Sequence, residues 1–340
     1  MSRSVFSNPT PGLCGISGFG VPIPPEMSRI EVATGHGNAG SVTNVGSGDV
    51  HPSSVRPLPG QMRSSPAVGV AFVVGLPRSG TTLLAYLLAG CRQSLSLSEP
   101  YLAHAIFNER RLARFFRHAK GKTRLAEFPQ PAPAMSRDGM LDYLIGVAAA
   151  NGLPHLILKE TYRLGGNWDN VALMNWIAAG GHPVVAIARH PYDIAVSSIR
   201  FTRWWRGPIG HFLRLWAPGL PLFADDAEVA EYVGLNWAAY AEWCVQHRLS
   251  VVRYEDLVAD PAARLPGICD QLRVPFEPAM LDHNAPRGPF GGIGDPGVLN
   301  KPSRPVTDSS VGRKHLLAPK LCEIIARLCA NQAVAMGYSM

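Results

Sequence analysis

Gly75-Leu76-Pro77-Arg78-Ser79-Gly80-Thr81-Thr82 stands between two apolar runs, and this arrangement decides the fold. The run before it, residues 68–74, is typical of a buried strand, and the run after it, residues 83–89, is typical of a helix. A glycine-bounded loop between a strand and a helix is the context in which a phosphate-binding loop forms. The first backbone N–H groups of such a helix have no intrahelical partner, so the stretch predicts a site for a phosphate or a similar anion.

The loop differs from the nucleotide-triphosphatase pattern at one informative position. Thr81 stands where that pattern has its phosphate-binding lysine, and Thr82 keeps the hydroxyl that would reach a magnesium ion. Arg78 supplies a cation inside the loop instead. The loop therefore favours an anion site other than the common kinase type.

Pro77 to Thr82 resembles the 5′-phosphosulfate loop of the sulfotransferases that use 3′-phosphoadenosine 5′-phosphosulfate (PAPS), with the bacterial and tyrosylprotein-type members most similar. Further segments carry the same resemblance, which spans roughly residues 68 to 336. Arg189 and Ser197, eight positions apart, are similar to the signature that binds the 3′-phosphate. For Arg189, a surface salt bridge with Asp193 is the structural alternative.

Two later segments add weaker matches to that family. Tyr254 lies in a segment similar to one whose tyrosine touches the nucleotide, although a core tyrosine is almost equally consistent with the residues. Arg313, in residues 310–314, lies in a segment similar to the one that closes over the 3′-phosphate. The resemblance implies that the 5′-phosphate and sulfonate are held by the phosphate loop, namely by Arg78, Ser79, Gly80, Thr81 and Thr82.

Catalysis of sulfonate transfer needs a base for the acceptor hydroxyl and a cation for the departing oxygen. The resemblance implies Glu99 as the base, with a pKa raised by burial, and Lys159 together with Arg78 as the cations. A structural glutamate that caps the next helix is the alternative for Glu99, and His104 and His155 are the reserve candidates for the base. Family precedent implies that no metal is required.

Strands that alternate with helices indicate an α/β fold. We expect a P-loop-type, three-layer α/β/α domain whose central, mainly parallel sheet has about five strands. The expected strands lie near residues 68–75, 94–98, 153–158, 183–188 and 249–253. Each is followed by a candidate polar residue, and ligands of such sheets bind beyond the carboxyl ends of the strands. Residues 101–119 are expected to form a helix, and residues 284–312 a long loop.

Composition sets the boundaries of the domain and the class of ligand. Residues 1–66 are rich in Gly, Pro and Ser, which predicts a disordered segment before a sulfotransferase-like domain at 67–340. The net charge of +7 suits an anionic ligand, and the chain lacks the motifs of a nucleic-acid-binding protein. Six cysteines without a CxxC pair indicate free thiols in a reducing cytoplasm. No membrane span or signal peptide is expected, which suggests a bacterial, cytoplasmic protein.

The acceptor is the part of the reaction that the sequence leaves open. Residues 201–223 interleave tryptophans and arginines, a pattern that suits an acceptor or a lipid surface and equally suits plain packing. A hydroxyl of a sugar, a phenol, a lipid or a peptidyl tyrosine fits, and the oligomeric state is open. The alternatives to a sulfotransferase are a P-loop kinase acting on a small molecule and a non-catalytic nucleotide-binding module.

Overall fold

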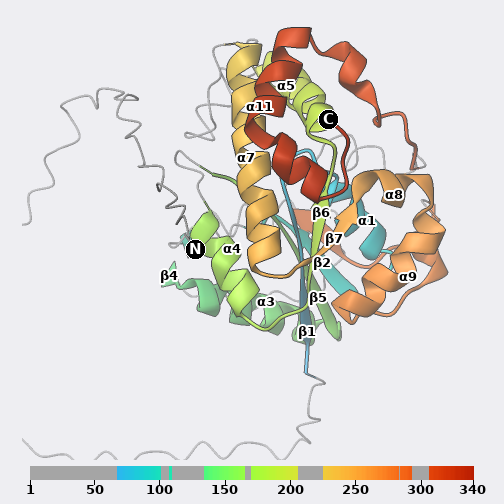
Figure 1. The fold of residues 1–340 in the computed structure, drawn as a ribbon. Coiled ribbons are helices and arrows are strands. Elements are labelled where there is room, and N and C mark those ends of the chain that lie inside the picture. Colours follow the sequence, from blue (N-terminus) through green and yellow to red (C-terminus); the bar gives the residue numbers. More distant parts are fainter. Residues whose placement is uncertain are drawn as a thin grey trace, which may run out of the picture. The chain divides into compact units, whose positions relative to one another are not determined.

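The computed structural model describes residues 67–100, 107–108, 134–164, 170–205, 225–282, 284–292 and 306–340 (Figure 1). All of them belong to one compact unit of the chain, residues 61–340. The predicted disorder of residues 1–66 lies outside the described residues.

The central sheet has six strands, and every neighbouring pair in it is parallel. The strands are β1 (Gly69–Gly75), β2 (Ser94–Ser98), β5 (His155–Thr161), β6 (Val184–Ala188), β7 (Ser250–Arg253) and β8 (Phe290–Gly292). Their order is β7-β6-β1-β5-β2-β8, which places β1 and its phosphate loop near the middle. The five expected strands are confirmed. The sixth, β8, was not expected because its three residues lie in the Gly/Pro-rich stretch.

A second, small sheet corrects one expectation. Strand β3 (Phe107–Asn108) pairs antiparallel with β4 (Ala134–Met135). The helix expected over residues 101–119 is therefore wrong at this pair, because pairing with a distant segment outweighs the local preference. The rest of that expected helix lies outside the described residues.

Helices cover both faces of the central sheet. One face carries α1 (Thr81–Leu88), α8 (Tyr254–Ala259) and α9 (Pro261–Leu272). The other carries α3 (Arg137–Ala150), α4 (Val171–Ala179), α5 (Pro191–Trp205), α7 (Asp226–Gln246) and α11 (Pro319–Ala335). Two short 3₁₀ helices, η3 (Pro278–Met280) and η4 (Arg313–Leu316), complete the described elements. Figure 1 shows the resulting three layers, which confirm the predicted α/β/α architecture.

Several helices begin at side chains that accept hydrogen bonds from their first turns. Ser136 Oγ accepts from Gly139 N at 3.1 Å and starts α3, as its sequence position predicts. Asp260 starts α9 with a proline at the first helical position, also as predicted. Asp225 accepts two backbone N–H groups at the start of α7. These caps satisfy donors that a helix leaves unpaired.

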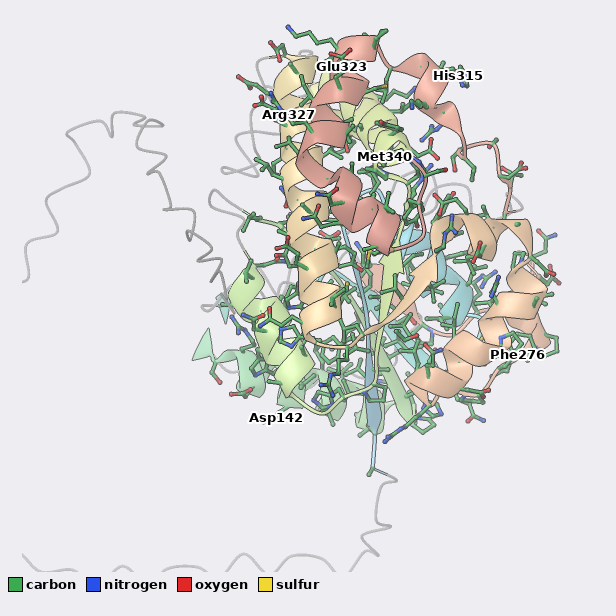
Figure 2. The ribbon with its side chains drawn as sticks, in the orientation of Figure 1. Asp142, Phe276, His315, Glu323, Arg327 and Met340 are labelled. Atoms are coloured by element: carbon green, nitrogen blue, oxygen red, sulfur yellow. The ribbon has the colours of Figure 1, made fainter. Side chains whose placement is uncertain are left out.

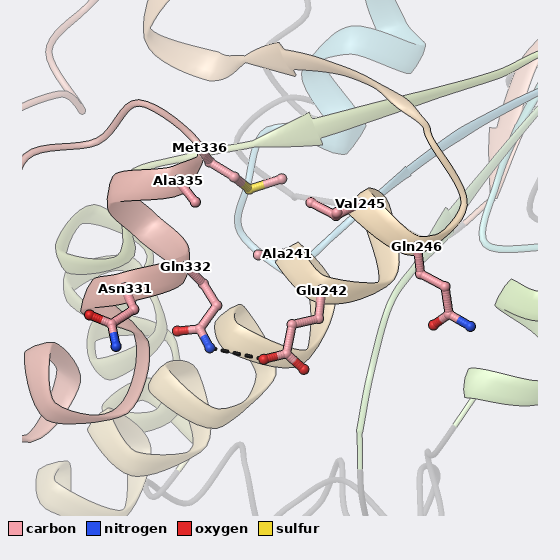
Figure 3. Close-up of a pocket in the computed structure, with 8 residues that line it drawn as sticks. All are labelled: Ala241, Glu242, Val245, Gln246, Asn331, Gln332, Ala335 and Met336. Atoms are coloured by element: carbon pink, nitrogen blue, oxygen red, sulfur yellow. Dashed lines mark hydrogen bonds between the residues drawn. The ribbon is translucent and has the colours of Figure 1, made fainter. Parts of the chain in front are cut away.

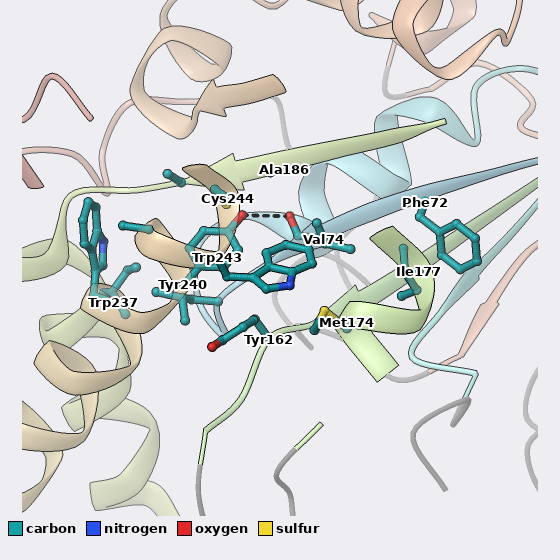
Figure 4. Close-up of a cluster of buried hydrophobic side chains, with 14 of the residues drawn as sticks. Phe72, Val74, Tyr162, Met174, Ile177, Ala186, Trp237, Tyr240, Trp243 and Cys244 are labelled. Atoms are coloured by element: carbon teal, nitrogen blue, oxygen red, sulfur yellow. Dashed lines mark hydrogen bonds between the residues drawn. The ribbon is translucent and has the colours of Figure 1, made fainter. Parts of the chain in front are cut away.

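Side chains of β1 alternate between two cores. Phe72 and Val74 face the five-helix layer, whereas Ala71 and Val73 face α1, α8 and α9. Figure 4 shows the first core, where Tyr240 of α7 lies among aromatic and aliphatic side chains. Its hydroxyl bonds to Val74 O at 3.3 Å and to Ile187 O at 3.2 Å. Because these two carbonyls lie at the ends of β1 and β6, Tyr240 fixes the edge of the sheet from which the phosphate loop leaves.

Helix α11 shows the same two-sided pattern. Glu323 and Arg327 lie on its exposed side in Figure 2, and both are exposed. Ile325 and Cys329 are fully buried. The apolar side of α11 packs beside α7 and α5 and closes the first core.

Two further observations concern the described cysteines and the described helices. The described cysteines have free thiols, and all but Cys322 are buried. Among the described helices, none combines the length and apolar character that crossing a membrane requires.

Candidate functional site

The phosphate loop joins β1 to α1 and needs glycine at both ends. A Cβ atom at Gly75 would lie 2.7 Å from Ile187 O, and one at Gly80 would lie 2.3 Å from Tyr254 Cδ2. Gly80 also has φ 97°, a backbone conformation that favours glycine. Ser79 closes the turn, because its N and Oγ both donate to Leu76 O, at 3.1 and 2.7 Å. The loop thus leads into the start of α1, which is a candidate anion site.

Arg78 has a strained backbone and points to α5. Its φ of 70° is uncommon for a residue other than glycine, and such conformations concentrate at functional sites. Its Nε donates to Ser197 Oγ at 3.0 Å, and its guanidinium lies 5.4 Å from the centre of the Phe201 ring. The structure therefore brings together two residues that the sequence predicts for the donor site.

Arg189 leaves the end of β6 and reaches the same loop. Its guanidinium donates to Arg78 O at 3.0 Å and to Ser310 O, and it lies 4.3 Å from the centre of the Tyr254 ring. Tyr254 in turn bonds to Ser310 Oγ at 2.7 Å. Asp193 bonds to the backbone of residues 312 and 313, not to Arg189 as the salt-bridge alternative requires.

These segments enclose a cavity of about 260 Å³ beyond the strand ends. Its lining residues are Arg78, Gly80, Thr81, Thr82, Leu83, Arg189, Ser197, Tyr254, Ser310 and Arg313. Of the predicted donor-binding residues, only Ser79 is missing from the lining, because its hydroxyl is committed to Leu76 O. Ser310 and Leu83 were not predicted. Segments far apart in the sequence therefore meet at one small, cationic cavity.

The guanidinium groups of two arginines at this cavity are wholly or partly shielded from solvent and only partly hydrogen-bonded within the described residues. Arg189 is 5% exposed, and the Nε atoms of Arg189 and Arg313 are buried without a hydrogen-bond partner among the described residues. Burial lowers the pKa of the Arg189 guanidinium, and the neighbouring charge of Arg78 lowers it further. Burial and Arg189 act on Arg313 in the same way. Because arginine keeps its charge in proteins, an anion is the ligand that would relieve this repulsion.

A second polar cluster lies at the carboxyl ends of β2 and β5, with Lys159 inside β5 and not after it as expected. Glu99 Oε1 lies 2.5 Å from Lys159 Nζ, and Glu99 Oε2 lies 3.2 Å from Arg163 Nη2. Glu99 N donates to Lys159 O at 2.7 Å, and Glu99 has φ 52°. Strand β1 is the neighbour of β5 in the sheet. Tyr162 N, directly after β5, donates to Gly75 O at the end of β1 at 2.8 Å, which places the cluster beside the phosphate loop. The predicted base and the predicted leaving-group cation are therefore in direct contact.

The pKa of Glu99 corrects one expectation. Burial alone would raise it, as the sequence argument assumed, but the charges of Lys159 and Arg163 and their hydrogen bonds outweigh burial, and the pKa is lowered. Glu99 is consequently an ionised carboxylate that can accept a proton, although in this arrangement it is a weaker base than expected.

Arg163 is the residue of this cluster that the sequence did not predict. Its N donates to Asn170 Oδ1 at 2.8 Å, and the next backbone N–H, of Leu164, donates to Asn236 Oδ1 at 2.7 Å. Both asparagines are buried. The buried side chains of Asn170, which directly precedes α4, and of Asn236, on α7, are the signal that could have indicated a fixed backbone at residues 163 and 164.

The reserve candidates for the base have different outcomes. His155 is the first residue of β5, so it lies toward the amino end of the strand, whereas Lys159 lies toward the carboxyl end. Burial lowers the pKa of His155. His104 lies outside the described residues. Of the 201–223 segment, residues 201–205 extend α5 and the rest lie outside the described residues.

A second pocket, of about 480 Å³, lies between α7 and α11 (Figure 3). Its lining is mostly apolar, and its polar side chains include Glu242, which accepts a hydrogen bond from Gln332 at 2.9 Å. This pocket has no cationic side chain in its lining and lies near the carboxyl end of α7. It does not fit an anionic ligand. Within the described residues, no group of three or more His, Cys, Asp and Glu side chains could hold a metal ion.

Comparisons with known proteins identify the fold. No protein-family model matches the chain, and no curated protein matches its sequence. The chain is similar to the solved sulfotransferase domain from the curacin biosynthetic pathway, with a TM-score of 0.54 and 23% identity, over 80% of this chain and 99% of that one. It is also similar to the sulfotransferase domain from the Synechococcus PCC 7002 olefin synthase, with a TM-score of 0.52 and 23% identity, over 80% of this chain and 95% of that one. The fold of this chain is therefore that of the sulfotransferase domains.

Proposed function

We propose that the chain is a sulfotransferase that moves the sulfonate group of PAPS to an acceptor hydroxyl. The observation that carries the proposal is the cavity in which a phosphate loop without the Walker lysine faces Arg189 and Arg313, whose buried Nε atoms have no hydrogen-bond partner among the described residues. PAPS carries anionic groups at two separate positions, the 5′-phosphosulfate and the 3′-phosphate. A site with a phosphate loop and a separate pair of arginines suits this charge pattern.

Each predicted donor-binding residue has a role in this proposal. The loop amides with Arg78, Ser79, Gly80, Thr81 and Thr82 hold the 5′-phosphosulfate. Arg189, Arg313 and Ser197 hold the 3′-phosphate, because planar guanidinium groups bind phosphate oxygens at two points. Tyr254 contributes a ring beside Arg189 at the nucleotide.

The reaction uses the neighbouring cluster. The acceptor oxygen forms a bond to sulfur while the bond from sulfur to the bridging phosphate oxygen breaks, and the nucleotide leaves as the 3′,5′-bisphosphate (PAP). Glu99 accepts the hydroxyl proton, and Lys159 with Arg78 stabilises the charge on the leaving oxygen. These cations serve the purpose that magnesium shares in kinases, so we propose that no metal is required.

The contact between Lys159 and Glu99 links donor binding to the base. In this proposal Lys159 moves from Glu99 Oε1 to the bridging oxygen, while Arg163 stays on Oε2. Lys159 and Arg163 both lower the pKa of Glu99, so the pKa rises when Lys159 moves away. Donor binding would thus make Glu99 a stronger base at the moment when a base is needed.

Ligand binding tests the donor. PAP at a hundredfold excess over its dissociation constant should stabilise the protein by about 2.7 kcal/mol in thermal unfolding. ATP should stabilise it much less, because ATP has no 3′-phosphate for Arg189. Equal stabilisation by ATP and PAP, together with strict magnesium dependence, would support the kinase alternative and overturn the proposal.

An acceptor library assayed with labelled PAPS tests the transfer itself. Sugars, phenols, lipids and tyrosine peptides each offer the required hydroxyl. Binding of PAP without transfer to any hydroxyl, water included, would support the non-catalytic nucleotide-binding module. The cytoplasmic location and bacterial origin stay predictions.

A further inference from the structure

Asp193 is a buried carboxylate at the 3′-phosphate side of the cavity that no role yet explains. It lies in the first turn of α5 and is 1% exposed. Its Oδ2 accepts from Gly312 N at 2.9 Å, and its Oδ1 accepts from Arg313 N at 2.7 Å. Arg313 Nη2 also donates to Asp193 O at 3.2 Å. Asp193 therefore holds both the backbone and the side chain of Arg313.

The anchored backbone also carries the other contact of this side of the cavity. Ser310, two residues before Gly312, accepts from Arg189 at its carbonyl and bonds to Tyr254 at its hydroxyl. Gly312 has φ 70°, which turns the chain into η4. Without the carboxylate, two backbone N–H groups at this turn would lose their acceptor. The segment that places Ser310 and Arg313 would then be held much less firmly.

We infer that Asp193 is the positioning residue of the 3′-phosphate subsite, which it forms by fixing residues 310–313 against α5. The inference rests on the proposed function, since it concerns the same cavity. The inference predicts the direction in which removal of Asp193 changes the affinity for the 3′-phosphate. As a nearby negative charge, Asp193 would repel a phosphate, so its removal would strengthen binding. As a positioning residue, its removal weakens binding. The structure favours the second outcome because both carboxylate oxygens are occupied by backbone donors.

The experiment compares two nucleotides that differ only in the 3′-phosphate. Dissociation constants of PAP and of adenosine 5′-monophosphate are measured by calorimetry. The constant for the monophosphate divided by the constant for PAP is the ratio that isolates the contribution of the 3′-phosphate. In Asp193→Asn the side chain keeps its size, but its amide nitrogen cannot accept a backbone N–H. We expect the ratio to fall about tenfold or more, which corresponds to about 1.4 kcal/mol per factor of ten. Binding of the monophosphate should change little.

Two further variants separate positioning from a general loss of stability. Asp225→Ala is the control for lost stability, because Asp225 Oδ1 accepts two backbone N–H groups at the start of α7, which alanine cannot do, and Asp225 lies outside the cavity lining. It should leave the ratio unchanged. Arg313→Met should lower the ratio, and adding Asp193→Asn to it should lower the ratio only a little further, because Asp193 acts in part through Arg313.

The outcomes distinguish this inference from the proposed function. A wild-type ratio near one would overturn both. A large wild-type ratio that Asp193→Asn leaves unchanged or increases would overturn this inference alone, as would full additivity with Arg313→Met. Should Asp193→Asn not fold, hydrogen exchange on the wild-type protein decides. Slow exchange at the amides of Gly312 and Arg313 supports the anchor, and exchange at the rate of an open chain overturns it.

Discussion

Gly80→Ala tests whether the phosphate loop and Tyr254 form one rigid wall of the cavity. Alanine at φ 97° is strained, which costs about 1 kcal/mol. Its Cβ atom would also lie 2.3 Å from Tyr254 Cδ2. The ring cannot easily move away, because Arg189 covers it and Ser310 holds its hydroxyl. Overpacking of this kind adds about 2 kcal/mol, so we expect a total destabilisation of about 3 kcal/mol.

Gly152→Ala is the matched control for backbone strain. Gly152 has φ 68°, but nothing lies within 4 Å of the position where a Cβ atom would be. It should therefore cost about 1 kcal/mol, which is the strain alone. In a domain of this size, each kcal/mol lowers the melting temperature by about 2–4 °C, so differential scanning calorimetry resolves the two variants.

The same variant should also impair the cavity. Moving Tyr254 disturbs Arg189 and Ser310, so PAP affinity should fall about tenfold or more, while Gly152→Ala should bind PAP normally. In a Tyr254→Ala background, the added cost of Gly80→Ala should shrink to that of Gly152→Ala. Equal melting temperatures for Gly80→Ala and Gly152→Ala, or unchanged PAP binding by Gly80→Ala, would refute the reasoning.

Three further predictions concern the Glu99 cluster. Glu99→Gln should keep PAP binding nearly intact and lower turnover roughly a hundredfold, as measured with any acceptor that the library identifies; full turnover would place the base elsewhere. Activity should survive exhaustive EDTA treatment but fall in Lys159→Ala with little change in PAP affinity, and the opposite pattern would count against Lys159 as the leaving-group cation. Because the pKa of Glu99 is lowered by folding, its carboxylate contributes stability above its unfolded pKa of about 4.3, and that contribution is lost as pH falls through the folded pKa. The stability gap between wild type and Glu99→Gln in urea unfolding should therefore narrow from pH 7 to pH 3, and a gap that widens would contradict the ion pair.

Much of the fold could be predicted because its signals are local. The apolar run before Gly75 and the glycines at both ends of the loop fix a strand, a turn and a helix within twenty residues. Ser136 and Asp260 mark helix starts by their own side chains. The cavity residues Arg189 and Tyr254 could be placed because each follows a strand of a parallel sheet.

The parts that could not be predicted depend on contacts between distant segments. Strand β8 is too short to show a periodic pattern and exists because it pairs with β2. Arg163 contacts Glu99 from a backbone that Asn170, before α4, and Asn236, on α7, hold by hydrogen bonds. Without Arg163, the direction of the pKa shift of Glu99 could not be derived from the sequence.

The all-parallel sheet has a consequence for how the cavity is assembled on the ribosome. Neighbours in the sheet are far apart in the chain: Gly75 pairs with Thr161 and with Ile187, and Ser96 pairs with Phe290. The phosphate loop is translated early, yet Arg313, which completes the lining, is translated more than two hundred residues later. Such pairings make folding slow, because long loops must close before the contacts form. Under the proposed function, a nascent chain can therefore bind both phosphate groups of the bisphosphate nucleotide only after nearly all of the domain has emerged, so retention on an immobilised bisphosphate would report that translation of the domain is complete.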